Sequence, residues 1–302
     1  MKYPFSAITQ RGPIQWPNDA KVALIVTINL EHWDMVKDTN EPYYAGGPSI
    51  LPSTLPGNVA DFPNYSWREY GQRVGVWRLF ELFDEVGVPA SCAINAKVAL
   101  ERPAIVDAVK ERGWEILAHN YEQAELLTIF AHDADGEREV VLRTLEVYEQ
   151  IIGKPAKGWL SSSLRGTVNT CGLLAEQGLI FYCDIMNDDQ PYLISTDHGD
   201  IVSVPYNIEI NDYTMLSRMS FSTDQFLDAM KEELSVILSE AEASGSGRMM
   251  NVGLHPHVSG RAYRVRAIRD FLSYAKSLDG VWFATREEIA EWYLQNNAGH
   301  IV

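Results

Sequence analysis

The sequence has few of the features that mark secreted or membrane proteins. It holds only 3 cysteines in 302 residues, and Cys92, Cys171 and Cys183 are scattered among apolar residues. This spacing argues against a disulfide framework or a cysteine zinc site and is typical of reduced thiols in the cytoplasm. No apolar run approaches the roughly 20 residues of a spanning helix, and the N-terminus lacks the apolar core of a signal peptide. We therefore expect a cytoplasmic protein without a membrane partner.

Basic residues are also scarce. The chain has 25 Lys and Arg against 41 Asp and Glu, which gives a formal net charge of -16. Such a charge repels the backbone of a nucleic acid, so we expect a small-molecule substrate and no nucleic-acid partner. A small anionic substrate stays open, because a local group of arginines can override the overall field.

Apolar strand patterns alternate with amphipathic helix patterns along most of the chain. No glycine-rich GxGxxG turn follows any of the strands, so a dinucleotide-binding fold lacks its fingerprint. Alternation of this kind predicts parallel βαβ units, and about seven units favour a closed or nearly closed barrel. The expected strands cover residues 22–29, 90–98, 114–119, 157–160, 179–184, 200–206, 249–254 and 281–284.

The chain reads as a single α/β domain over residues 1–302, because no linker or internal repeat divides it. Residues 1–20 read as an irregular arm. Residues 35–72 form a long proline-rich insertion, and loops of this length inside a domain are usually lids or binding loops. The sequence does not choose between a lid and a subunit contact, and we expect a homo-oligomer.

Polar residues follow several of the expected strands at their carboxyl ends. Glu31 and His32 follow the first strand, His119 and His255 end two others, and Asp184 ends a fourth. In parallel barrels the working residues lie where the strands end, and these ends share one face. The pattern therefore predicts an active site built from these residues.

The order of these segments resembles the polysaccharide deacetylase superfamily, carbohydrate esterase family four. That resemblance implies a distorted (β/α)7 barrel. The matching segments are INLEH at 28–32, HNYEQ at 119–123, GWLS at 158–161, Asp184 and the pair Leu254-His255.

The resemblance also indicates which residues stand at the metal-binding positions of the family. Glu31 stands where the family has its general base, and His32 where it has a metal-binding aspartate. Gln123 replaces the second histidine of the metal pair and is a poor ligand for zinc. The ligands left for a metal are His32, His119 and Glu122. We therefore expect either no cofactor or one divalent metal ion, with zinc as the natural choice.

A divergent branch of the superfamily resembles the chain more closely, namely the allantoinases of the polysaccharide-deacetylase type and the bacterial cyclic imide hydrolases. The matching stretches include YGQRVGVWRLFELFDEVGVPAS, KGWLSSSLRGTVNTCGLLAEQG and NVGLHPHVSGRAYRVRAIRDFLSYAKSLDG. This branch implies hydrolysis of a carbon–nitrogen bond in a small amide or cyclic amide, with or without a metal.

A mechanism follows from what amide hydrolysis needs, namely an activated water and a proton for the leaving nitrogen. We expect Glu31 to be the base, with its pKa raised toward neutrality by burial. His32 and His119 would position the water. His255 would donate the proton, and Asp184 would orient it as a carboxylate does in hydrolytic triads.

The remaining candidates would bind the substrate. Trp33 and Trp159 lie at strand ends and could wall a planar ring, although most tryptophans of the chain belong to the core. Asp189 and Asn207 follow strand ends, and His257 follows His255. Polar contacts to a substrate are expected there, with turn formation as the alternative.

Three functions compete. The first is hydrolysis of a small cyclic amide, imide or ureide. The second is a metal-dependent N-deacetylase of peptidoglycan or chitin-like sugars, and the third is a catalytically inactive barrel. Glu31, His119 and His255 together favour an enzyme, and the incomplete metal set favours the first function.

Overall fold

The computed structural model describes residues 2–35, 50, 55 and 59–301. Most of the proline-rich insertion therefore lies outside the described residues. Its end forms helix α1 (Phe62–Tyr70), which the sequence reading had placed in a loop. Asp61 begins this helix by accepting a hydrogen bond from the backbone N–H of Asn64.

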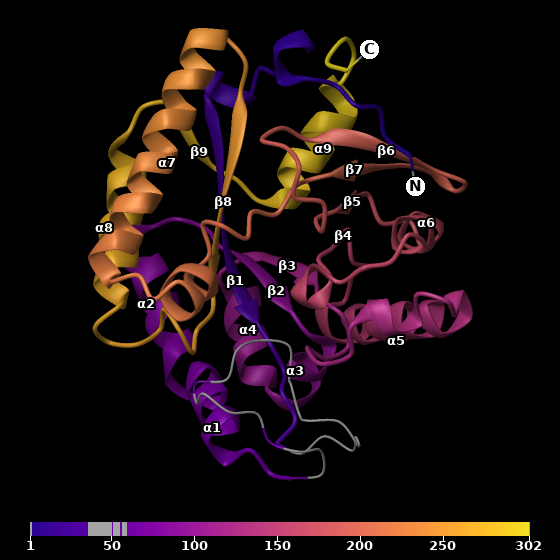
Figure 1. The fold of residues 1–302 in the computed structure, drawn as a ribbon, viewed down its shortest axis with the longest axis vertical. Coiled ribbons are helices and arrows are strands. Elements are labelled where there is room, and N and C mark those ends of the chain that lie inside the picture. Colours follow the sequence, from indigo (N-terminus) through magenta and orange to yellow (C-terminus); the bar gives the residue numbers. More distant parts are fainter. Residues whose placement is uncertain (1, 36–49, 51–54, 56–58, 302) are drawn as a thin grey trace.

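Nine strands form one curled sheet in the order β6-β7-β5-β4-β3-β2-β1-β8, and β9 pairs with the first half of β1 (Figure 1). All pairs are parallel except the β6–β7 hairpin. The strands are β1 Val22–Leu30, β2 Ser91–Ile94, β3 Glu115–Ala118, β4 Gly158–Trp159, β5 Phe181–Tyr182, β6 Tyr192–Thr196, β7 Gly199–Ser203, β8 Arg248–Leu254 and β9 Val281–Phe283.

Helices connect most of the strands, and most of them cover the outside of the sheet (Figure 1). The last helix instead packs Ile289, Ala290 and Tyr293 into the inner hydrophobic layer. The helices are α1, α2 Val76–Val86, α3 Ala96–Glu101, α4 Pro103–Glu111, α5 Ala134–Ile152, α6 Thr170–Glu176, α7 Thr223–Ser244, α8 Val265–Ser277 and α9 Arg286–Asn296. A π-helical turn, η3 Gly71–Gly75, joins α1 to α2. Shorter turns are η1 Ile8–Gln10, η2 Pro17–Asp19, η4 Leu127–Phe130, η5 Ser162–Leu164 and η6 Tyr213–Arg218.

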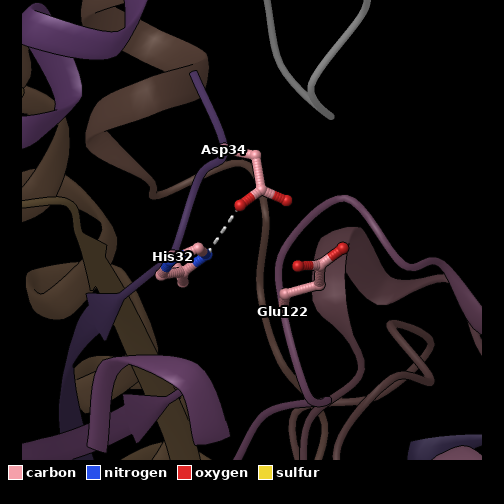
Figure 2. Close-up of side chains that lie close together, drawn as sticks. All are labelled: His32, Asp34 and Glu122. Carbon is pink, nitrogen blue, oxygen red and sulfur yellow. Dashed lines mark ion pairs between the residues drawn. The ribbon is translucent and has the colours of Figure 1, made fainter. Parts of the chain in front are cut away.

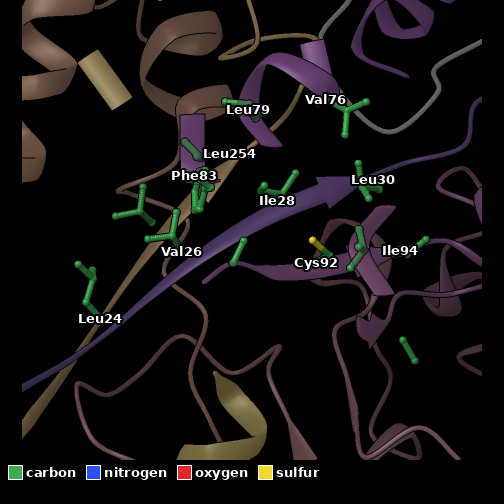
Figure 3. Packing of buried hydrophobic residues seen from close by; sticks show 14 of the residues in the cluster. Leu24, Val26, Ile28, Leu30, Val76, Leu79, Phe83, Cys92, Ile94 and Leu254 are labelled. Carbon is green, nitrogen blue, oxygen red and sulfur yellow. The ribbon is translucent and has the colours of Figure 1, made fainter. Parts of the chain in front are cut away.

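Strand β1 is buried on both faces, and its side chains alternate between two hydrophobic layers. Ala23 and Ile25 point into the barrel. Leu24, Val26, Ile28 and Leu30 point outward and pack with residues of α2 and β2, as Figure 3 shows. This alternation decides which residues at the strand ends can reach the inside of the barrel.

The free edge of β8 is covered by other segments, and no strand pair among the described residues joins it to β6. Gly253 donates its backbone N–H to Ile210, and Gly247 donates to Ile14 of the N-terminal arm. The indole of Trp16 donates to the carbonyl of Arg248 at 2.9 Å. The predicted distorted (β/α)7 barrel is confirmed, whereas the single-domain organisation stays a prediction.

The predicted strand at 90–98 is too long. Strand β2 ends at Ile94 and helix α3 begins at Ala96. Asn95 between them accepts a hydrogen bond from the backbone N–H of His32 and donates to the carbonyl of His119. This asparagine therefore ties together the ends of three neighbouring strands. None of the helices in the described part of the chain is long and apolar enough to span a bilayer.

Candidate active site

Three strands place a polar side chain inside the barrel at their carboxyl ends. Glu31 continues the inward face of β1, His119 that of β3, and His255 that of β8. All three line one cavity of about 240 Å³, here called the inner cavity. Its remaining walls are polar and apolar in similar measure and include Asn29, Gln123, Leu126, Leu160, Leu164, Tyr206, Ile208 and Tyr213.

His255 lies between two carboxylates. Its Nδ1 is 2.7 Å from Oδ1 of Asp212, and its Nε2 is 3.4 Å from Oε1 of Glu31. The second oxygen of Asp212 accepts the backbone N–H of His255 at 2.7 Å. Asp212 is fully buried, so it fixes both the position and the orientation of the imidazole.

The pKa of Glu31 differs from the prediction. Burial alone would raise the pKa of Glu31, but the charge of His255 and its hydrogen bond lower that pKa to about 2. Burial likewise opposes protonation of His255, yet Asp212 and Glu31 raise its pKa to about 10. The predicted rise of the Glu31 pKa toward neutrality is therefore wrong, because an imidazolium lies beside the carboxylate.

His119 faces Glu31 and His255 as a neutral group. Burial, followed by the charge of His255, lowers its pKa more than Glu31 and the carbonyl of Leu160 raise it. Its Nδ1 is 2.6 Å from the Leu160 carbonyl oxygen, which requires the proton to be on Nδ1. Its Nε2 is buried without a hydrogen-bond partner among the described residues. This nitrogen therefore offers a lone pair to a molecule in the cavity.

Trp33 lines the inner cavity and also contacts Glu31. Its indole N–H donates to Oε2 of Glu31 at 3.2 Å. The buried guanidinium of Arg68 from α1 stacks 3.6 Å above the centre of the Trp33 ring. One carboxylate oxygen of Glu31 thus faces the indole while the other faces His255.

His32 points away from the inner cavity. With Asp34 and Glu122 it forms what is here called the outer cluster, whose potential ligand atoms lie within 4.8 Å of one another (Figure 2). His32 Nε2 is 3.2 Å from Oε2 of Glu101, and Nδ1 is 4.0 Å from Oδ1 of Asp34. The Lys97 ammonium contacts Glu122 and lies 3.6 Å from Asp34.

The predicted metal set is therefore divided between two places. His119 belongs to the inner cavity, whereas His32 and Glu122 belong to the outer cluster. The inner cavity offers one free imidazole nitrogen and a carboxylate already paired with His255, which does not fit a catalytic zinc with three protein ligands. The outer cluster is a possible His/Asp/Glu site, and a lysine ammonium partly neutralises it.

Two other predicted residues also point out of the barrel. Asp184 follows Tyr182 on the outer face of β5, accepts the backbone N–H of Ser161 at 2.7 Å and the Tyr182 hydroxyl at 2.8 Å, and does not contact His255. Asp212, and not Asp184, makes the contact with His255 that was predicted for Asp184. Trp159 is fully buried in the outer layer and donates to Ser161, so it does not wall the cavity.

The remaining predicted contacts lie beside the inner cavity. Asp189 and Asn207 line a second cavity of about 580 Å³ that shares Tyr206 with the first. The side-chain oxygen of Asn207 accepts the backbone N–H of Glu209 at 2.7 Å and so makes a turn. His257 is buried behind His255, at 5.8 Å between ring centres, and packs on Trp67. None of the three lines the inner cavity.

Two glycines of η3 hold the loop that follows His255. A Cβ on Gly75 would overlap the carbonyl of Pro256, and one on Gly71 would lie 2.6 Å from the backbone nitrogen of His257. The π-helical turn thus packs its bare backbone directly against this loop. π-Helical turns of this kind are frequent at functional sites.

The sequence did not indicate Asn29 as a site residue, and it did not indicate that Asp212 contacts His255. Asn29 donates to the Tyr206 hydroxyl and to the carbonyl of Leu254, which links β1 to β8 below the cavity. The period of two along β1 could have found Asn29, since it shares a face with Glu31. Asp212 follows no expected strand, so no such signal existed.

Comparisons with known proteins agree with this architecture. No protein-family model matches the chain. A protein of Schizosaccharomyces pombe, provisionally named a polysaccharide deacetylase, is 27% identical over an alignment of 306 positions that covers 91% of each chain. A probable polysaccharide deacetylase of Pseudomonas aeruginosa has a TM-score of 0.86 and 29% identity, over 97% of this chain and 99% of its own. The allantoinase PuuE has a TM-score of 0.86 and 27% identity, over 98% and 99%.

Proposed function

We propose that this chain, which resembles the polysaccharide deacetylase superfamily and its allantoinase branch in sequence and fold, hydrolyses a small cyclic amide, imide or ureide. The predicted resemblance is confirmed. The enzyme class, a hydrolase of carbon–nitrogen bonds other than peptide bonds, agrees with the relatives named above. The ring substrate and the residue roles are our proposal.

The observation that carries the proposal is the triad of Asp212, His255 and Glu31 at a small cavity. At neutral pH His255 holds a proton and Glu31 is ionised, because their pKa values are about 10 and about 2. The cavity of about 240 Å³ lies below the roughly 300–1,000 Å³ of pockets for drug-sized ligands. A single ring is therefore a better match than a buried sugar chain.

The reaction begins with a water between Glu31 and the free Nε2 of His119. Its oxygen attacks the amide carbon while Glu31 takes a proton, and the developing oxyanion lies near the His255 imidazolium. His255 then gives its Nε2 proton to the leaving nitrogen and the carbon–nitrogen bond breaks. Asp212 holds the imidazole in place throughout.

The low pKa makes Glu31 a weak base while His255 is charged, so Glu31 holds the proton of water firmly only as His255 passes its own proton to the leaving nitrogen. The charge of His255 is what lowers that pKa against the effect of burial. Once His255 has given up its proton, the lowering effect disappears and Glu31 holds its own proton more firmly. That proton can then return to His255 across their 3.4 Å contact, which restores the starting charges.

An N-deacetylase is the second candidate, because two of the relatives are named as deacetylases. Its usual chemistry needs a metal-activated water, and the ligands of the inner cavity do not fit that ion. The same carboxylate–imidazole pair could still cleave an exposed acetamide that reaches in from the mouth of the cavity.

The setting in the cell is part of the proposal. Cys92, Cys171 and Cys183 are all free and buried, which is compatible with a cytoplasmic location. We also propose a homo-oligomer that acts on a small molecule. Size-exclusion chromatography with light scattering measures the oligomeric state. A monomer at micromolar concentration contradicts the proposed homo-oligomer.

The decisive experiment is a substrate panel for the purified protein. Hydantoins, allantoin, dihydropyrimidines and succinimides are tested for ring opening by chromatography, and N-acetyl sugars for release of acetate. Ring opening that disappears in Glu31→Gln supports the proposal. Acetate release without ring opening assigns the deacetylase function, and no turnover of either class favours the inactive barrel.

A further inference from the structure

Two arginines at the inner cavity differ from the other arginines of the chain. Arg165 and Arg218 both line it, and neither places its guanidinium in a hydrogen bond or ion pair with a described residue. Arg218 only approaches the Tyr213 ring, at 5.6 Å. Apart from Arg68, which stacks on Trp33, every other arginine makes a hydrogen bond or an ion pair with a described residue.

These arginines come from separate parts of the chain. Arg165 follows η5 after strand β4, and Arg218 ends η6, which starts directly after Asp212. In a chain with 41 acidic residues against 25 basic ones, two guanidiniums at one cavity that pair with no acidic residue of the described chain are unexpected. Their charge is available to a ligand, and an arginine fork matches the geometry of a carboxylate.

The buried end and the mouth of the inner cavity carry different charged groups. Glu31, His119 and His255 lie at the buried end, whereas both arginines are exposed to solvent. Leu126, Leu164 and Ile208 contribute apolar wall to the same cavity. A substrate with an uncharged ring and a terminal anion fits this order. Its anion cannot lie at the buried end, because the ionised Glu31 would repel it.

We propose that the substrate is a ring amide, imide or ureide that carries a carboxylate, and that Arg165 and Arg218 bind this carboxylate at the mouth of the cavity. This inference rests on the proposed function for the identity of the ring. The two arginines determine specificity, and they also draw an anion toward a protein of net charge -16.

The test compares matched probes with and without the charge, hydantoin-5-acetate and dihydroorotate against their carboxamides. Binding is measured by calorimetry on the Glu31→Gln variant, so the result does not depend on turnover. We expect each acid to bind about 100-fold more tightly than its carboxamide, an effect typical of two charged hydrogen bonds. Arg165→Gln and Arg218→Gln should each remove about tenfold of this preference and leave carboxamide binding unchanged.

Arg138→Gln is the matched control, because Arg138 pairs with Glu176 on the surface and does not line the cavity. The preference for the acids should also weaken as salt is added. Equal affinity for acid and carboxamide, no binding of either acid, or a preference that survives both arginine substitutions overturns the inference. The proposed function falls separately, if no ring amide of the wider panel is opened.

Discussion

The inner cavity and the outer cluster start from consecutive residues and yet are different places. Glu31 continues the inward face of β1 and meets His255, whereas His32 continues the outward face and meets Asp34 and Glu101. Side chains at successive positions of an extended backbone point to opposite sides. The comparison teaches that neighbours at a strand end cannot be assumed to act on one water, and each prediction below tests that separation.

The largest effect is expected for Glu31→Gln. The amide keeps the size of the side chain but loses the charge that accepts the proton of water, so kcat/KM should fall by about 10³-fold or more. Asp34→Asn makes the same chemical change in the outer cluster and should alter kcat/KM by less than about threefold. A larger loss for Asp34→Asn would mean that the outer cluster takes part in the chemistry.

Asp212→Asn should follow, with a fall in kcat of about 10²–10³-fold, because the imidazole loses the anion that keeps it protonated and oriented. The matched variant Asp184→Asn tests the carboxylate that points out of the barrel. Its effect on kcat should stay within about threefold in steady-state assays, although thermal unfolding can shift because Asp184 supports Ser161 and Tyr182. Equal losses for both variants would contradict the assignment of Asp212.

The pH dependence separates the two ends of the triad. The pKa of His255 is raised to about 10, so its stabilising charge is fully present below its ordinary value of 6.5 and is lost as pH rises through about 10. The pKa of Glu31 is lowered from 4.5 to about 2, so its contribution is present above 4.5 and is lost below.

We therefore expect kcat/KM to be flat through neutral pH and to fall on the alkaline side near pH 10. Asp212→Asn should move this alkaline limb toward neutrality, because it removes the main group that raises the His255 pKa. The measurement is a pH–rate profile of both proteins. An alkaline limb already near 6.5 in the unmodified protein would show that His255 is not held as a cation.

The smallest effect is expected from removing divalent ions. Exhaustive dialysis against a chelator should change kcat/KM by less than about twofold, because the mechanism uses Glu31, His119 and His255 alone. His32→Gln should also retain activity and cost about 1 kcal/mol of stability through the lost contact with Glu101. Activity that vanishes with the chelator and returns with zinc would reassign the chemistry to a metal.

Much of the fold could be predicted from the sequence, because the strands of a parallel barrel are long apolar runs separated by amphipathic helices. The hairpin partner β6 and the helix α1 were not predicted, since one is a half-exposed strand and the other lies within a proline-rich stretch. Glu31, His119 and His255 line one cavity, and the sequence indicated their common face because each follows the end of a strand.

The other residues at the strand ends could not be assigned from the sequence in the same way. His32, Trp159 and Asp184 also end strands, and only the register of inward and outward positions separates them from the inner residues. Asp212 reaches His255 from a segment that bridges to β8 through Asn211 and Gly253. A contact between residues 43 positions apart in the sequence leaves no local pattern.

The backbone contact between the η3 glycines and the loop after β8 limits which segments can be exchanged with those of a relative. Gly71 and Gly75 meet His257 and Pro256 with no room for a side chain, so this contact fixes the loop that follows His255. A chimera that takes its proline-rich segment from a relative should therefore be joined ahead of Gly71. Such an exchange leaves the contact of Gly71 and Gly75 with the loop after β8 unchanged, and the position of His255 with it.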